Sequence, residues 1–122
     1  MRNLTWLTIL LVFFSATKIY AKDVILSSVI LESVSVINVP SLGHKAGNLE
    51  IKVFNGIADL QGLNCDPLYI TTSNDGVGFN NMISVLLAAH AARKPVILGV
   101  TDNPAYNAFP GRCSLLFASI QM

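Results

Sequence analysis

The side chains that could carry out acid–base or metal chemistry are few in this chain, and they lie far apart. Its two histidines are His44, in a glycine-containing loop, and His90, late in an alanine-rich stretch. Their spacing matches none of the short patterns in which paired histidines hold zinc. Hydrolysis requires a nucleophile with a base and an orienting group, or two converging carboxylates. Neither pattern is recognisable, so we predict a protein that is not an enzyme and has no catalytic residue, metal site or cofactor.

An exported enzyme is retained as the third alternative. It would be supported by His44 lying beside a carboxylate and a hydroxyl group in a deep pocket. Without such a pocket, we expect His44 to be a solvated loop residue and His90 to be a partly buried helix residue.

Hydrogen-bonding side chains are concentrated in one loop. The segment from Thr101 to Asn107 combines amide, carboxylate and hydroxyl groups with a tyrosine ring, the mixture that sugar recognition requires. We predict that four of its residues contact a ligand: Asp102, Asn103, Tyr106 and Asn107. The segment from Thr71 to Asp75, with Tyr69 nearby, is a second and less rich candidate. The alternative for both segments is that such residues simply form turns.

The chain has two cysteines, Cys65 and Cys113, and they do not form a Cys-x-x-Cys motif. In an oxidising compartment an even pair of this kind is most simply a structural disulfide. It would close a long loop and contribute about 4 kcal/mol in the chain-entropy model. The alternative is a reactive or metal-binding pair of thiols.

Residues 1–21 have the organisation of a secretory signal peptide. Arg2 precedes an apolar core from Leu4 to Phe14, and a more polar segment follows that ends in Ala21. We predict cleavage after Ala21 and a secreted or periplasmic protein. The alternative, an uncleaved membrane anchor, is disfavoured because a spanning helix needs about 20 apolar residues.

Residues 22–122 form a single domain that is nearly neutral. The chain has eight Lys and Arg residues and seven Asp and Glu residues. Removal of Arg2 and Lys18 with the signal leaves a formal charge of −1. Clustered basic residues, which mark nucleic-acid-binding proteins, are not seen. We expect no nucleic-acid partner, no membrane contact after cleavage, and either a ligand recognised by shape and hydrogen bonds or association between copies of the chain.

Hydrophobic patterning predicts a mainly β domain with one α-helix. The strands are expected at Val24–Val39, Leu49–Phe54, Leu68–Thr72, Val96–Thr101 and Cys113–Ile120, and the helix at Phe79–Arg93. The first strand is long enough to bend, at Ser27-Ser28 or at Ser33, and Asn80 or Asn81 can cap the helix. The order β-β-β-α-β-β is that of a five-stranded Greek-key barrel of the OB type. The alternative is an open α+β sheet.

The second half of the chain resembles a group of short exported bacterial proteins. The resemblance rests on Phe79-Asn80-Asn81-Met82, on Ala92-Arg93-Lys94-Pro95-Val96 with the strand that follows, and on Gly111-Arg112-Cys113-Ser114. These proteins are similar to the OB-fold B subunits of AB5 toxins of the subtilase-cytotoxin type. The resemblance covers roughly residues 50–120 and implies a ring-forming module that binds cell-surface glycans.

These observations predict an exported, non-catalytic binding module for a glycan or a protein ligand, and association into a homo-oligomer is a further expectation. The alternative is a periplasmic structural or inhibitor-like protein that acts through protein contacts.

Overall fold

The computed structural model describes residues 21–57 and 61–122. The predicted signal peptide falls on residues 1–21 and therefore lies almost entirely outside the described residues.

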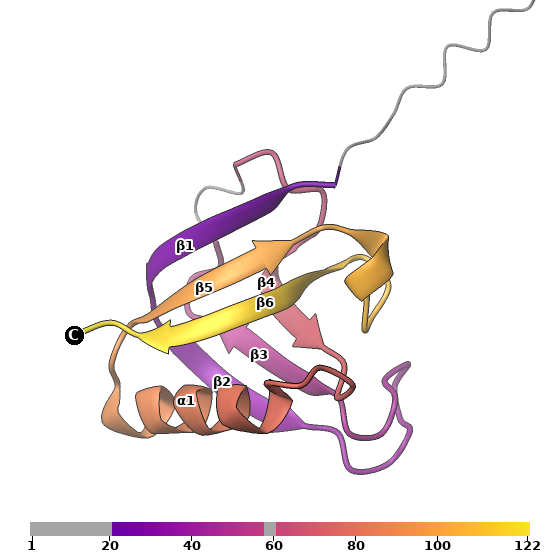
Figure 1. Ribbon diagram of the computed structural model, residues 1–122, viewed down its shortest axis with the longest axis horizontal. Helices are drawn as coiled ribbons and strands as arrows, with labels where there is room; N and C mark the ends of the chain where they lie inside the picture. The colour runs from indigo at the N-terminus through magenta and orange to yellow at the C-terminus, as the bar shows by residue number, and fades with distance from the viewer. Residues whose placement is uncertain (1–20, 58–60) are drawn as a thin grey trace, which may run out of the picture.

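The described residues form one mixed six-stranded sheet and one α-helix (Figure 1). The strands are β1 (Asp23–Val29), β2 (Leu31–Val36), β3 (Leu49–Val53), β4 (Asp66–Thr72), β5 (Val96–Thr101) and β6 (Arg112–Ile120). The helix α1 (Phe79–Ala92) lies between β4 and β5, and a short 3₁₀ turn, η1 (Pro104–Tyr106), lies between β5 and β6. The strand order is β1-β5-β6-β4-β3-β2, with β4 and β6 parallel and the other pairs antiparallel. The prediction of a mainly β fold with one helix is confirmed.

The two edge strands of the sheet are consecutive in the chain. β1 and β2 are separated by Ile30 alone, and they pair with β5 and β3, at opposite ends of the strand order. Ser28 has a left-handed backbone (φ 57°), and the β1–β5 register shifts between Leu26 and Val29. The expected long strand therefore bends near the predicted position and becomes two strands.

The described residues form six strands, whereas five were predicted from the sequence. If β1 and β2 are counted as one bent strand, the order of neighbours is that of the OB-type Greek key, with the helix between the third and fourth strands. The sheet is nevertheless not closed, because β1 and β2 do not pair with each other. The barrel is thus open between its two edge strands.

The hydrophobic core lies between the concave face of the sheet and the helix. Alternate residues of the strands, such as Leu49, Ile51 and Val53 in β3, are buried there. α1 packs against β2 and β6 and contributes Leu86 and Ala89, both fully buried.

Neither end of the helix is capped by a polar side chain; backbone groups make the capping contacts at its C-terminal end. The N-cap is Gly78, and no side chain caps the first turn, so the prediction of a cap at Asn80 or Asn81 is wrong. At the other end Arg93 is left-handed (φ 52°), and its N–H donates to carbonyl groups of the last turn. Pro95 follows, so the chain leaves the helix at this point and enters β5.

The predicted disulfide between Cys65 and Cys113 is present, with a Cα–Cα distance of 5.0 Å. It joins the segment before β4 to the start of β6, and Cys113 is fully buried. A structural disulfide is consistent with an oxidising compartment outside the cytosol. Across residues 21–57 and 61–122, no helix has the length and apolar character needed to cross a membrane.

Candidate functional site

A groove of 670 Å³ opens between the start of α1, the end of β6 and the η1 turn, and we call it the α1–β6 groove. It is lined by the loop before α1 (Thr72, Ser73, Asp75, Gly76 and Gly78), by α1 (Phe79, Asn81, Met82 and Val85), by η1 (Ala105 and Tyr106) and by β6 (Leu115–Ala118). The two loops that the sequence marked as candidate binding segments, 71–75 and 101–107, therefore meet at one groove.

The floor of the groove is apolar. Phe79 and Met82 from the first turn of α1 are half-buried against the core, and Leu115 of β6 is buried. Phe117 lies opposite Gly99 of β5, so close that a Cβ atom at Gly99 would overlap the phenyl ring. A glycine at this position therefore leaves room for the Phe117 ring against the neighbouring strand, where the ring lines the groove.

Polar groups stand at the rim. The Ser73 hydroxyl donates a hydrogen bond to the Asp75 carboxylate, and Asn81 is exposed on the first turn of α1. Tyr106 of η1 is 57% exposed, which leaves its ring available at the side of the groove. A concave surface of this size that is mainly apolar, with a few polar groups at its rim, is typical of ligand sites.

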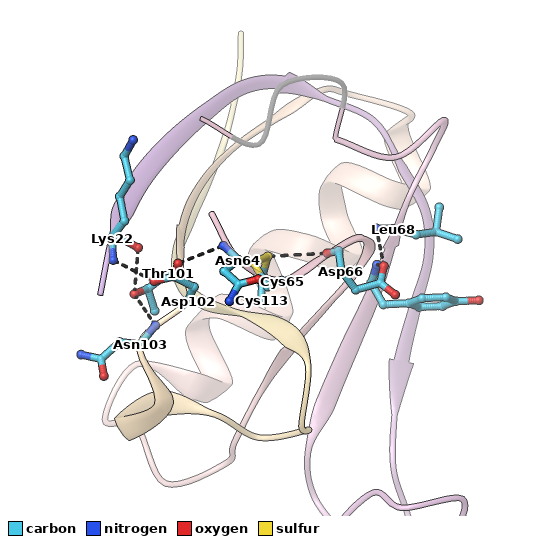
Figure 2. Close-up of a disulfide and its surroundings, with 10 residues drawn as sticks. Lys22, Asn64, Cys65, Asp66, Leu68, Thr101, Asp102, Asn103 and Cys113 are labelled. Carbon is cyan, nitrogen blue, oxygen red and sulfur yellow. Dashed lines mark hydrogen bonds between the residues drawn. A yellow bond between two sulfur atoms is a disulfide. The ribbon is translucent and has the colours of Figure 1, made fainter. Parts of the chain in front are cut away.

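Asp102 is not among the residues that line the groove. Its Oδ1 atom accepts a hydrogen bond from the backbone N–H of Lys22 at 2.7 Å, and its Oδ2 atom accepts one from the N–H of Asn64 at 3.0 Å (Figure 2). The hydrogen bonds from Lys22 and Asn64 lower the pKa of the Asp102 carboxyl below its usual value. Both oxygens thus join separate chain segments, and Asp102 is not part of the groove.

Asn103 and Asn107 are used at the two ends of η1. The Asn103 side chain accepts a hydrogen bond from the N–H of Ala105 at 3.0 Å and so caps the turn. Asn107 ends the turn with its N–H donating to the carbonyl of Pro104 at 3.2 Å. The four predicted ligand contacts are therefore divided: Tyr106 lines the groove, and the other three lie in or beside the turn that presents it.

A second polar site, which sequence reasoning did not identify, surrounds Glu50 of β3. Arg112 at the start of β6 donates to Glu50 Oε2, and His44 Nε2 lies 3.2 Å from the same oxygen. The Arg112 guanidinium lies over the rings of Tyr69 (4.6 Å) and Phe109 (4.1 Å). We call these five residues the Glu50 cluster. Strand alternation correctly puts Glu50 on the face away from the core, but only the fold shows that loop residues cover it.

The prediction of a solvated His44 is wrong. Its side chain is 10% exposed and its ring lies 4.5 Å from that of Phe109. Burial lowers the pKa of His44, and the positive charge of Arg112 lowers it further, so the neutral ring is favoured. Nδ1 is buried without a hydrogen-bond partner. Nε2 lies between the Glu50 carboxylate, at 3.2 Å, and Arg112 Nη1, at 3.3 Å, so it contacts both a hydrogen-bond acceptor and a hydrogen-bond donor.

The Glu50 cluster also bears on the enzyme alternative. His44 does lie beside a carboxylate, and Thr71, whose buried hydroxyl has no partner, is opposite Glu50 in the β3–β4 register. However, Arg112 already neutralises Glu50, and the Phe109 ring packs on both Arg112 and His44. The geometry is that of a closed ion pair and not of an acid–base site open to a substrate.

The other histidine is exposed, contrary to the prediction of partial burial. His90 Nε2 lies 3.1 Å from the backbone carbonyl of Glu32 and so connects α1 to the edge strand β2. Within residues 21–57 and 61–122, no three His, Cys, Asp or Glu side chains gather in a way that could hold a metal ion.

No protein-family model matches the chain, and a search of the curated proteins gave no match either.

Proposed function

We propose that the protein is an exported, non-catalytic binding module and that its ligand occupies the α1–β6 groove. The observation that carries this proposal is the convergence of segments 71–75 and 101–107, far apart in the chain, on one groove with an apolar floor and a polar rim. The signal-like residues 1–21 and the disulfide support a secreted or periplasmic location.

A glycan is the ligand class that the groove suits best. The exposed Tyr106 ring can stack on the apolar face of a sugar, while Ser73, Asp75 and Asn81 offer groups that hydrogen-bond to sugar hydroxyls. Asp75 is the one charged residue among those that line the groove. Its negative charge favours a neutral sugar over a sialylated or sulfated one.

The strand order supports, at the level of topology, the resemblance to OB-fold B subunits of AB5 toxins. Self-association is the second element of that resemblance. Several large apolar side chains outside the groove are exposed, among them Ile25, Val36, Val39 and Phe54. On a domain with so few charges, these side chains support a homo-oligomer.

A glycan array read together with light scattering tests the proposal. Tyr106→Ala should weaken binding of an array hit at least tenfold, because stacking area on the sugar is lost. Gly76→Trp should block the groove: a Cβ at Gly76 meets no atom within 4 Å and its φ is not positive, so the fold should tolerate the change. Lys94→Ala is the control, since Lys94 is exposed, does not line the groove and is not one of the apolar side chains proposed for self-association.

Binding that survives both groove variants would refute this site, and a monomer with no array hit would refute the glycan module. The second candidate, a structural or inhibitor-like protein, is favoured by one observation: most of the groove floor is apolar, as in sites for protein side chains. It predicts no sugar binding and co-purification with one partner protein, which Gly76→Trp should release.

A further inference from the structure

The backbone N–H, the backbone carbonyl and the side-chain ammonium group of Lys22 all form hydrogen bonds. Its N–H donates to Asp102 Oδ1 at 2.7 Å, and its carbonyl accepts from the hydroxyl of Thr101 at 3.2 Å and from the N–H of Asp102 at 3.3 Å. Its Nζ atom donates to the carbonyl of Gln61. Figure 2 shows Lys22 beside Thr101 and Asp102, with Asn64 on the other side of the carboxylate.

This residue is also the first one after the predicted cleavage point. Hydrolysis of the Ala21–Lys22 peptide bond consumes one water molecule. It forms a carboxyl group on Ala21, which loses a proton, and an amine on Lys22, which binds a proton. Before cleavage this nitrogen is an amide with one hydrogen to donate. After cleavage it is an ammonium group with three.

We propose that Asp102 is a built-in binding site for the α-ammonium group of Lys22, which removal of residues 1–21 creates. Cleavage then converts a neutral N–H donor, already 2.7 Å from the carboxylate, into one member of an ion pair. The proposal goes beyond the ligand site and uses none of the groove residues. It assigns to Asp102 a role in maturation in place of one in ligand binding.

The geometry requires no rearrangement to form this pair. Asp23, the next residue, already pairs with Thr101 in the β1–β5 ladder, so the Lys22 nitrogen is fixed at the end of β5 where Asp102 follows. Oδ2 is oriented by the N–H of Asn64, which is adjacent to the disulfide at Cys65. Charge-assisted hydrogen bonds are stronger than neutral ones, so the mature chain should hold β1 more firmly.

Charges around the new amine favour its protonated form. Asp102 lies in direct contact, and Asp23 is the next residue of β1. The ε-ammonium of Lys22 itself is turned to the Gln61 carbonyl. An α-amino group has an ordinary pKa of about 7.7–8.0, and a carboxylate partner raises it. The contribution to stability is thus complete below that range and is lost as pH rises through the raised pKa.

The first experiment uses the protein exported from cells. Mass spectrometry of its N-terminal peptide should show Lys22 as the first residue, and an NMR titration then gives the pKa of the α-amine. We expect that pKa to be raised in the wild type, to return to the ordinary range in Asp102→Asn, and to stay raised in the control Asp75→Asn. A different first residue, or equal values in the wild type and Asp102→Asn, would overturn the proposal.

A second measurement does not depend on Asp102→Asn folding. Thermal unfolding is compared for the wild type beginning at Lys22, the same chain acetylated at that nitrogen, and a chain that retains Ala21. The free amine should give the highest midpoint at pH 6, and the advantage should vanish above the amine pKa. Equal midpoints for free and acetylated chains at pH 6 would contradict the ion pair, whatever the glycan array shows.

Discussion

Two polar regions of this molecule use similar side chains for opposite purposes. One is a connected set of contacts, which we call the anchored network. It consists of Lys22, Asp102, Asn64, the Cys65–Cys113 disulfide, Arg112, Glu50 and His44. The other is the α1–β6 groove, where Ser73, Asp75, Asn81 and Tyr106 stand at an exposed rim.

Successive members of the anchored network are adjacent in the sequence or are joined by a hydrogen bond, an ion pair or the disulfide. Asp102 binds Asn64, which precedes Cys65, and the disulfide leads to Cys113 beside Arg112. Its charged groups satisfy one another, so few of them are left to recognise a ligand. The groove instead presents polar groups and an aromatic ring to solvent. Charged residues that gather on a fold therefore do not by themselves mark a binding site; the availability of their hydrogen-bonding groups does.

The largest effect on stability is expected from removal of the disulfide. Replacing both Cys65 and Cys113 with Ala should lower the free energy of unfolding by about 4 kcal/mol, because a loop with a sequence separation of 48 residues is no longer closed in the unfolded chain. Urea denaturation measures the change, and the wild type under reducing conditions should show a similar loss. An unchanged midpoint would show that hydrogen bonds alone hold the network.

The next largest effect is expected at Arg112. Arg112→Ala leaves the Glu50 carboxylate, whose side chain is only 15% exposed, without its cationic partner, and should cost about 2–3 kcal/mol. Lys52→Ala is the control: its ion pair with Glu32 is more exposed, and its loss should cost at most about 1 kcal/mol. Chemical denaturation distinguishes the two variants, and equal losses would mean that burial of the Glu50 cluster is energetically unimportant.

A smaller effect should appear in the pH dependence of stability. The folded protein lowers the pKa of His44, so the unfolded chain binds more protons just below about pH 6.5. Stability should therefore fall as the pH drops from that value toward the lowered pKa. His44→Gln should flatten this part of the curve, because the group with the lowered pKa is then absent. Thermal midpoints measured between pH 7 and pH 5 provide the test.

The smallest effects on stability are expected in the groove. Tyr106→Ala and Gly76→Trp should change the free energy of unfolding by no more than about 0.5 kcal/mol, because both sites are exposed and open. The same variants should have the largest effects on ligand binding. A loss of several kcal/mol in the free energy of unfolding of Tyr106→Ala would contradict this expectation, because it would show that Tyr106 stabilises the fold.

Most of the secondary structure could be predicted from local patterns. The alternation of Leu49, Ile51 and Val53 and the apolar spacing of α1 depend on near neighbours, and the helix begins at Phe79 as expected. The two cysteines sufficed for the disulfide, since no other pairing exists. The order of elements also limited the topology to a few choices, of which the OB-type order is the one observed.

Local sequence patterns thus account for the class of the fold, the cross-link and the two loops rich in hydrogen-bonding residues. Long-range contacts in the fold establish which members of those loops remain available. Both oxygens of Asp102 accept hydrogen bonds from Lys22 and Asn64, which are distant in the chain, whereas Tyr106 stays exposed and lines the groove. Glu50, which strand alternation places on the face away from the core, is covered by Arg112 and His44. The physical reason is that hydrogen-bond partners separated by tens of residues leave no periodic trace along the chain, so only folding reveals which polar groups are already satisfied.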